Sequence, residues 1–366
     1  MAQSALRVSV LQVDGFRNLR GVRIEPGHGA NVFVGDNGQG KTSLLEALDY
    51  ACSLRSFRGA LRAQLVGHEA PRARITADVH AEPLGRHYEV TIQRTERTIT
   101  LDGKRPESAI AYYGPAACVV FHPGDLELIR GGPENRRRLL DRILLRTAPG
   151  YGETLRMYMR ALRSRNVLLR QRTDDAKALA AYEPTLARTG SRVVSERRAL
   201  VEHLAAAAIR SVEQVTGFDD GVGVEYRTRG SDDESAYREL LARSLGEDRQ
   251  RLSTGIGPHG DEIVIRWGGR AARTVASQGQ ARAVALGLRL AEMTVLRERT
   301  GRTPWLLLDD VSSELDRART ARLFEHIAAS EAQLWVTTTD PSIGELVVAP
   351  QWYRVHDGEV TNVSRA

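Results

Sequence analysis

The chain has 366 residues, of which 42% are hydrophobic, and it carries a formal net charge of +6. This length suits two domains, or one large domain with an insertion. No apolar run reaches about 18 residues, which excludes a membrane-spanning helix, and the N-terminus lacks an apolar signal core. We therefore expect a cytoplasmic protein. The two cysteines, Cys52 and Cys118, predict neither a disulfide framework nor a metal site.

The first 120 residues or so are predicted to be mainly β-strands. Apolar runs or alternation indicate strands at LRVSVLQVDGFRNL, GVRIEPGHGANVFVG, RARITADVHA, HYEVTIQR and RTITLDG, the last turning at Asp102-Gly103. KTSLLEALDYACS has its leucines at helical spacing and interrupts this series. A short buried strand, Cys118–Phe121, ends at His122-Pro123-Gly124.

The clearest motif is GDNGQGKT, which matches the phosphate-binding pattern G-x-x-x-x-G-K-[ST] between a predicted strand and a predicted helix. Only three of the chain's 52 basic residues are Lys, yet the motif position that needs a slim point charge holds one of them. A Gly-rich turn without a ligand is the alternative. The residues expected to bind nucleotide phosphates here are Gly35, Asp36, Asn37, Gly38, Gln39, Gly40, Lys41 and Thr42.

From Asp125 to about Arg210 the apolar period becomes helical. One predicted helix has its apolar face at Leu155–Leu169, and a second begins near Pro184. Joined near Thr173–Ala178, the two helices would form a short antiparallel arm. The mixed segment Gly217–Gly246 is placed at the base of the arm. The expected division is residues 1–125 and 247–366 for one α/β domain, with 126–246 as an inserted helical arm.

The arm region is strongly basic. Twelve Arg and only three acidic residues lie between Arg130 and Arg172, which predicts a phosphate-rich partner. A solvated helix face in an Arg-rich protein is the alternative. The residues expected to contact such a partner are Arg136, Arg137, Arg138, Arg142, Arg156, Arg160 and Arg163, and they become DNA-contact candidates through the family resemblance described below.

From Arg251 strands and helices alternate again, through DEIVIRW, a helix at Gly279–Glu298, WLLLDD and QLWVTTT, to a closing hairpin that turns at Asp357-Gly358. WLLLDD predicts a central parallel strand whose tip reaches the nucleotide. Asp309 would hold Mg²⁺ through water beside the Thr42 hydroxyl. Asp310 would orient or deprotonate the attacking water. A surface turn that happens to be acidic is the alternative.

Ser277-Gln278-Gly279-Gln280 precedes the predicted helix and could bind an anion at its N-terminus, although alone it could equally be an ordinary helix cap. Followed by LLLDD and SSELD, it resembles the signature sequence of ABC-type ATPase heads, with Ser313–Asp316 as the D-loop. In such heads the signature of one subunit closes over nucleotide held by the other. The resemblance therefore implies a homodimer with two shared ATP sites, in which Ser277 binds the γ-phosphate.

Further segments make the resemblance more specific. Gly15-Phe16-Arg17-Asn18, Arg55-Ser56-Phe57-Arg58, Gly257-Pro258-His259, SQGQ, LLLDDVSSELD and Thr337-Thr338-Thr339 look like the RecF family of bacterial recombination mediators, which is related to the SMC heads. The likeness runs from about Leu11 to Thr339. It implies an SMC-like P-loop ATPase head with a short helical arm. It also implies that Arg17 approaches the phosphates and that Thr338, with Lys41 and Asp310, belongs to the catalytic set.

The same resemblance implies a function. ATP binding would drive dimerisation on double-stranded DNA near single-strand/double-strand junctions, and slow hydrolysis would release it. The protein would help to load RecA at gaps together with RecO and RecR. Two departures are Gly260, where the family usually has Arg, and Ala281, where it usually has Gln. A transporter-type ABC ATPase subunit and a purely architectural DNA clamp remain alternatives.

Overall fold

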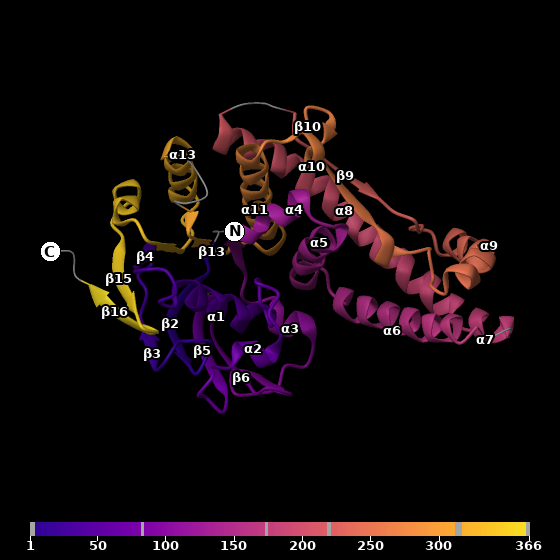
Figure 1. Cartoon of the computed structure of the whole chain (residues 1–366), viewed down its shortest axis with the longest axis horizontal. Coiled ribbons are helices and arrows are strands. Elements are labelled where there is room, and N and C mark those ends of the chain that lie inside the picture. The colour runs from indigo at the N-terminus through magenta and orange to yellow at the C-terminus, as the bar shows by residue number, and fades with distance from the viewer. Residues whose placement is uncertain (1–3, 82–83, 173–174, 218–220, 312–316, 364–366) are drawn as a thin grey trace.

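The structure is a computed structural model that describes residues 4–81, 84–172, 175–217, 221–311 and 317–363. Helix α1 (Lys41–Ser53) lies at its centre and contacts strands of two different sheets. The sheets and their covering helices form a head, from which a helical arm projects (Figure 1). Among the described residues, no helix is both long enough and apolar enough to cross a membrane.

The larger sheet contains the segments that the sequence links to nucleotide binding. Its strand order is β16-β15-β4-β14-β13-β8, parallel except at β16. The bounds are β4 (Ala30–Val34), β8 (Cys118–Phe121), β13 (Trp305–Asp309), β14 (Leu334–Thr338), β15 (Gln351–His356) and β16 (Glu359–Val363). The middle strands are covered on both faces, which explains their nearly unbroken apolar sequence. Because they are parallel, their carboxyl ends meet at one edge.

The second sheet is antiparallel, in the order β3-β2-β5-β6-β7. Its strands are β2 (Arg7–Asp14), β3 (Val22–Ile24), β5 (Ala73–Ala81), β6 (Leu84–Ile92) and β7 (Arg97–Leu101). These strands confirm the predicted N-terminal β region, including the turn at Asp102-Gly103. Two short strands, β1 (Ser4–Ala5) and β12 (Arg302–Thr303), pair separately.

Further helices complete the head. They are α2 (Arg62–Leu65), α3 (Ala109–Tyr113), α4 (Leu126–Arg130), α5 (Pro133–Thr147), α10 (Ala272–Val275), α11 (Gln278–Thr300) and α13 (Arg317–Ala328), with 3₁₀ turns η1 (Pro123–Asp125), η2 (Pro258–Gly260) and η3 (Pro341–Leu346). Helix α11 confirms the helix predicted at Gly279–Glu298.

The arm consists of α6 (Tyr151–Arg170), α7 (Ala176–Ala180), α8 (Glu183–Thr216) and α9 (Glu234–Arg251) (Figure 1). A small apolar core of its own includes Tyr158, Leu186 and Tyr237. Helix α8 continues into the head and packs along α11, where a side chain at Gly287 would clash with Val212. Since α8 belongs to both regions, the predicted boundaries near residues 125 and 246 do not divide the core cleanly.

The segment Gly217–Gly246 differs from the mixed base that we expected. Within it, β9 (Gly223–Arg227) pairs with β10 (Glu262–Trp267), which also pairs with β11 (Arg270–Ala271). Helix α9 then lies along α8 toward the end of the arm (Figure 1). DEIVIRW therefore belongs to a separate three-stranded sheet and not to the nucleotide-site sheet.

Candidate functional site

The predicted phosphate loop joins β4 to α1 at the carboxyl edge of the larger sheet. Gly40 has φ of 117°, a conformation that side-chain-bearing residues rarely adopt, and it directly precedes the first helical turn. The loop residues Asp36, Asn37 and Gly38 are exposed or half-buried, so the loop is open to a ligand. This strand–loop–helix geometry directs backbone N–H groups and the helix dipole at bound phosphates.

Lys41 folds back over the loop. Its Nζ donates to the carbonyl oxygens of Gly35, at 2.7 Å, and Asp36, at 2.8 Å. Burial lowers the pKa of Lys41, while the carboxylates of Asp310 and Asp309 act to raise it. The Lys41 ammonium therefore lies beside the loop and near the two carboxylates at the end of β13. A phosphate group would replace the two carbonyl acceptors.

Thr42 and Asp309 meet although 267 residues separate them in the sequence. The Thr42 hydroxyl donates to Asp309 Oδ1 at 2.8 Å, and the Thr337 hydroxyl donates to the same atom at 2.8 Å. Burial raises the pKa of Asp309, whose exposed fraction is 5%. A hydroxyl and a buried carboxylate beside a phosphate loop fit the partial, oxygen-only ligand set of a Mg²⁺ that is completed by phosphates and water. No cluster of three His, Cys, Asp or Glu side chains suited to an all-protein metal site occurs among the described residues.

Asp310 and Thr338 also lie at this edge. Asp310 follows β13 with φ of 51°, and its N–H donates to the carbonyl oxygen and the hydroxyl of Thr337, each at 3.1 Å. The turn holds the carboxylate of Asp310 near Lys41. Thr338 ends β14, is buried, and forms hydrogen bonds with the backbone of Asp340. In this conformation Thr338 therefore stabilises the turn after β14.

Among the residues that the structure describes, no hydrogen bond or ion pair joins the Arg17 side chain to the phosphate loop. Its guanidinium donates to both carboxylate oxygens of buried Glu46, at 2.9 and 3.0 Å, and to the Gln64 carbonyl oxygen at 3.0 Å. The neighbouring Asn18 reaches the loop instead, donating to the Gly38 carbonyl oxygen at 3.2 Å and accepting from Ser43 at 3.0 Å. The predicted approach of Arg17 to the nucleotide stays a prediction.

The turn of the C-terminal hairpin packs on the phosphate loop, which the sequence did not predict. The predicted hairpin itself is confirmed, with Asp357 and Gly358 both at positive φ. The Asp357 N–H donates to Gln39 Oε1 at 2.6 Å, and the Gly358 N–H donates to the Gln39 carbonyl oxygen at 3.0 Å. A side chain at Gly358 would overlap the Asn18 carbonyl group. The hairpin turn thus stabilises the phosphate loop. In the sequence, only the Asp-Gly pair indicated a turn at this position.

Ser277–Gln280 forms the exposed N-terminus of α11. Ser277 Oγ accepts from the Gln280 N–H at 3.2 Å, and Gln280 Oε1 accepts from the Ser277 N–H at 2.8 Å, a capping box. Each of the four residues is exposed or half-buried. No hydrogen bond found within the described ranges joins this segment to Gly35–Thr42. The predicted D-loop, Ser313–Asp316, lies outside the described residues.

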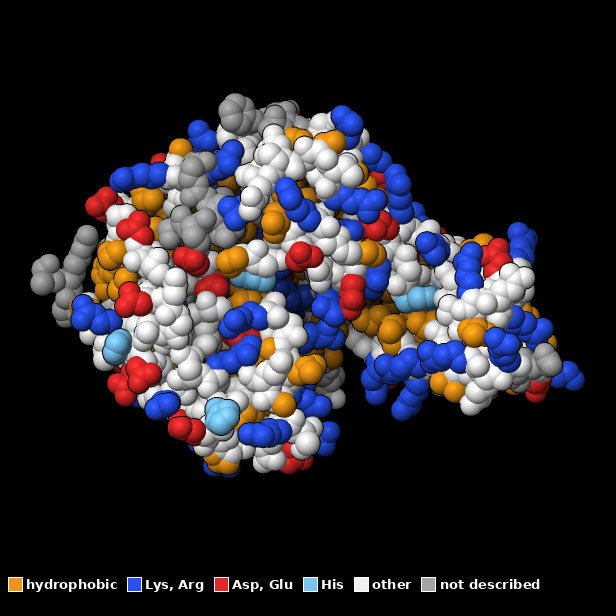
Figure 2. Space-filling model, viewed as in Figure 1, with side chains coloured by type: hydrophobic (Ala, Val, Ile, Leu, Met, Phe, Trp, Pro, Cys, Tyr) orange, Lys and Arg blue, Asp and Glu red, His pale blue; other side chains and the backbone are white. Residues whose placement is uncertain are grey.

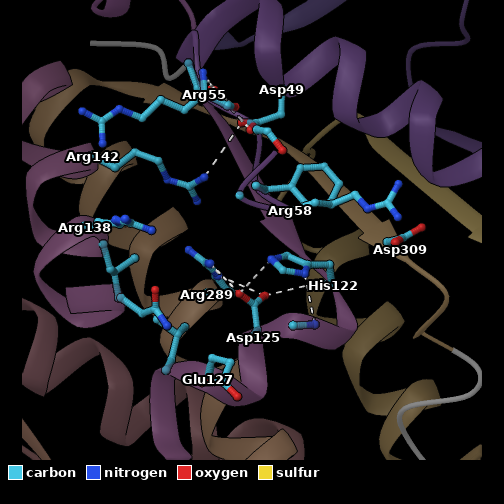
Figure 3. Close-up of a pocket in the computed structure, with 18 of the residues that line it drawn as sticks. Asp49, Arg55, Arg58, His122, Asp125, Glu127, Arg138, Arg142, Arg289 and Asp309 are labelled. Atoms are coloured by element: carbon cyan, nitrogen blue, oxygen red, sulfur yellow. Dashed lines mark hydrogen bonds and ion pairs between the residues drawn. The ribbon is translucent and has the colours of Figure 1, made fainter. Parts of the chain in front are cut away.

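A cavity of about 620 Å³ adjoins Thr42 and Asp309, the two residues that fit a Mg²⁺ site. It extends between the end of α1, the loop that contains Arg55 and Arg58, η1 and helix α5 (Figure 3). At its floor, Arg289 donates to Asp125 at 2.5 Å, and His122 lies 3.4 Å from the same carboxylate. Burial alone would raise the pKa of Asp125, but Arg289 and His122 hold it below its ordinary value. Sequence reasoning missed this group, apart from noting His122 as the end of a strand.

The seven arginines predicted to contact DNA do not share one surface. Arg136, 5% exposed, donates to Glu262 at 2.7 Å and to the Leu128 carbonyl oxygen at 2.9 Å, and Arg142 pairs with buried Glu292 at 2.9 Å. Helix α5 turns both toward the head, so Arg136 is buried and Arg142 half-buried, and their predicted contact with DNA stays a prediction. Arg137 is half-buried on the Asp261 carbonyl oxygen, and Arg138 is exposed beside Glu134.

The remaining three arginines behave differently. Arg156, Arg160 and Arg163 are all exposed and lie on one face of α6, with Arg170 continuing the row. Figure 2 shows a line of basic side chains along this edge of the arm. Glu153 is the acidic residue paired with Arg156, at 3.7 Å. The face is long, basic and available to a phosphate backbone.

The fold and this site define the class of the protein as a P-loop ATPase head of the SMC type. The AAA domain family matches residues 11–102. An SMC head domain from Pyrococcus furiosus shares the fold with a TM-score of 0.57 over 99% of this chain and 96% of that chain, at 16% identity.

Closer relatives identify the family. The DNA replication and repair protein RecF of Myxococcus xanthus is 40% identical over 97% of this chain and 97% of that protein. RecF of an Anaeromyxobacter species is 39% identical over 97% and 99%. A solved structure of the recombination mediator protein RecF with ATP superposes with a TM-score of 0.88, at 29% identity over 99% of both chains. The chain belongs to the RecF family, which leaves no support for a transporter subunit.

Proposed function

We propose that this protein is an ATP-dependent DNA clamp in recombinational repair. In this proposal it dimerises on ATP, binds double-stranded DNA near single-strand/double-strand junctions, and helps to load RecA at gaps with RecO and RecR. One observation carries the proposal: the residues of the nucleotide site converge at one sheet edge, whereas Ser277–Gln280 faces solvent. The relatives support the setting, since they are DNA replication and repair proteins and a recombination mediator in the RecFOR pathway.

The nucleotide chemistry follows from the observed positions. The loop N–H groups hold the phosphates, and Lys41 leaves the carbonyl oxygens of Gly35 and Asp36 to meet the transferred phosphate. Bound Mg²⁺ would supply positive charge to the phosphate oxygens, held by Thr42 and by Asp309 through water. Asp310, fixed by the backbone turn at Thr337, orients the attacking water and accepts its proton.

The second half of the site comes from a second copy of the chain. The cap of α11 leaves the first-turn N–H groups and the Ser277 hydroxyl in an accessible position, where they can bind a γ-phosphate held by the partner. ATP then lies between two molecules and stabilises the pair, whereas ADP lacks the shared phosphate. Occupancy of the site thus controls the dimer, and slow hydrolysis opens it.

The arm supplies the DNA contact. The row Arg156, Arg160 and Arg163 presents successive guanidinium groups on one exposed helix face, as phosphate binding requires. The proposed place of action is the cytoplasm, on the nucleoid. RecR is the proposed direct partner, with RecO bound to RecR and RecA acting downstream.

Sedimentation velocity with and without ATP tests the proposal on four proteins: wild type, Lys41→Met, Ser277→Arg and Asp310→Asn. Wild type should dimerise in ATP, and Asp310→Asn should do so more tightly because it binds ATP but hydrolyses it slowly. Lys41→Met should stay monomeric for lack of nucleotide. Ser277→Arg should bind ATP as a monomer. A loss of ATP-driven pairing in Asp310→Asn would count against the mechanism, and unchanged DNA repair by that variant would favour a purely architectural clamp.

A further inference from the structure

The cavity that adjoins Thr42 and Asp309 is lined by six arginines: Arg55, Arg58, Arg138, Arg142, Arg146 and Arg289. Figure 3 shows Arg142 and Arg289 entering from the side of α5 and α11, opposite Arg58. Thr42 and Asp309 belong to the same lining, so the cavity is continuous with the nucleotide site. The lining thus combines these six guanidinium groups with five carboxylates, Asp49, Asp125, Glu127, Asp141 and Asp309.

Arg146 is the residue that the fold alone does not explain. Its exposed fraction is 4%, and it makes one hydrogen bond, from Nη1 to the Arg142 carbonyl oxygen at 3.2 Å. Its Nε and Nη2 atoms are buried without a hydrogen-bond partner in the part of the chain that the structure describes. A buried guanidinium left in this state costs free energy, and a buried charge is normally paired.

Four of the five acidic residues that line the cavity already have partners, Asp309 through the hydroxyls of Thr42 and Thr337. Asp125 pairs with Arg289, and Asp141 pairs with Arg197 of α8 at 2.8 Å. Asp49 accepts from Cys118 at 3.0 Å and is 3.9 Å from Arg142. Burial raises the pKa of Cys52 to about 12, so this nearby thiol stays neutral and supplies no negative charge to Arg146.

We propose that this cavity binds inorganic phosphate, with Arg146 as its buried anchor and Arg55 at its rim. A tetrahedral oxyanion offers several acceptors to forked guanidinium donors, which is what the unpaired atoms of Arg146 lack. The phosphate can come from solution or from ATP hydrolysed at the adjoining site. The second source rests on the proposed ATPase function. In that case the cavity holds the phosphate released by hydrolysis before this phosphate leaves the protein.

Phosphate in solution is tested without nucleotide, by calorimetry and thermal unfolding of the full chain in phosphate or in chloride of equal ionic strength. Lys41→Met serves as the background, because it weakens phosphate binding at the loop. Adding Arg146→Met should weaken phosphate binding at least about tenfold and abolish the phosphate-dependent rise in Tm. The matched substitution Arg243→Met, on the exposed face of α9, should change neither. Equal stabilisation of all three proteins by phosphate would overturn the proposal.

Two further measurements distinguish a loss of phosphate binding from a loss of folding. In chloride, Arg146→Met should unfold at the same temperature as its parent or higher, because it removes an uncompensated buried charge. Should that variant fail to fold, Arg55→Gln at the exposed rim must still weaken phosphate binding several-fold, and unchanged binding in it would contradict the site.

Phosphate from ATP is tested by single-turnover kinetics in otherwise wild-type protein. Cleavage is followed by chemical quench and release by a fluorescent phosphate sensor. A lag between the two that Arg146→Met shortens identifies hydrolysed ATP as a source, and simultaneous cleavage and release restricts the site to phosphate from solution. A protein that does not hydrolyse ATP would refute the proposed function, yet the nucleotide-free titration would still decide whether the cavity binds phosphate.

Discussion

Helices α5 and α6 follow one another in the chain and are both rich in arginine, but they place these residues in opposite environments. Helix α5 packs on the head, so Arg136 and Arg146 are buried and Arg142 is half-buried beside Glu292. Helix α6 packs on α8 by one face and leaves Arg156 and Arg160 in solvent. The count of charges along a sequence therefore does not locate a nucleic-acid surface; the packing of each helix decides which charges are available.

The buried and exposed arginines also contribute differently to the free energies of folding and of binding. Buried charges on α5 depend on their partners, and removing one partner leaves the other uncompensated in a dry environment. Exposed charges on α6 contribute little to folding and act on a partner through counterion release.

Replacing Arg142 by Ala should destabilise the protein by about 2–3 kcal/mol, because buried Glu292 loses one of its two arginine partners and keeps only Arg289. Chemical denaturation measures the change. Arg243→Ala on α9 is the matched control and should stay within about 0.5 kcal/mol of wild type. A destabilisation below about 1 kcal/mol for Arg142→Ala would mean that the α5 arginines are not the structural group that we infer.

The triple change of Arg156, Arg160 and Arg163 to Gln should weaken binding to double-stranded DNA and leave stability almost unaltered. The dependence of log affinity on log salt should become shallower by about 0.9 for each DNA phosphate that is no longer neutralised by an arginine. Titrations at several salt concentrations measure both effects. An unchanged slope would show that this face is merely solvated and would leave the DNA surface unassigned.

Asp309→Asn should stabilise the nucleotide-free protein, by about 1 kcal/mol, while it removes the extra stability that Mg²⁺ with ATP confers. The reason is that burial raises the pKa of Asp309, so its ionised form opposes folding until a cation arrives. Asn can still accept from Thr42 and Thr337. Thermal unfolding without ligand measures the first effect, and thermal unfolding in ATP with and without Mg²⁺ measures the second. If the variant is less stable than wild type without ligand, the ionised Asp309 carboxylate does not oppose folding.

The smallest effect concerns His122, whose pKa is lowered by burial. Its Nδ1 accepts from the Gly124 N–H at 3.1 Å, an interaction that only the neutral ring makes. The unfolded chain then binds the proton first, so stability should fall as pH drops below about 6.5 toward the lowered pKa. His122→Gln should flatten this part of the profile relative to wild type. Parallel profiles would place the titrating group elsewhere, for example at His259, whose pKa is also lowered by burial.

The parts of the site predicted from sequence were those with a local signature. The phosphate loop needs a strand, glycines and a helix in direct succession, and the strand tip at Asp309 needs only an apolar run that ends in acids. Their meeting through Thr42 follows from parallel strands sharing one carboxyl edge. The long helices were predicted because their apolar periods are regular.

What the sequence did not reveal depends on contacts between distant segments. Nothing local to Arg136 distinguishes it from Arg156, because its burial depends on Glu262, which is 126 residues away. Helix α8 was not expected to enter the head, since an apolar stripe does not say which partner covers it. The bracing of Gln39 by Asp357 joins residues 318 positions apart and was equally beyond periodicity and motif.

The central claim, that a second copy of the chain completes the nucleotide site, is tested most directly by mixing two defective proteins. Lys41→Met lacks a working phosphate loop but keeps Ser277, and Ser277→Arg keeps the loop but lacks the signature. Each alone should remain monomeric and inactive in ATP. Their mixture should form ATP-dependent dimers and regain hydrolysis, because one composite site in each mixed pair is intact. ATP-driven dimerisation of Ser277→Arg alone, or a mixture as inactive as its components, would contradict a site shared between two chains.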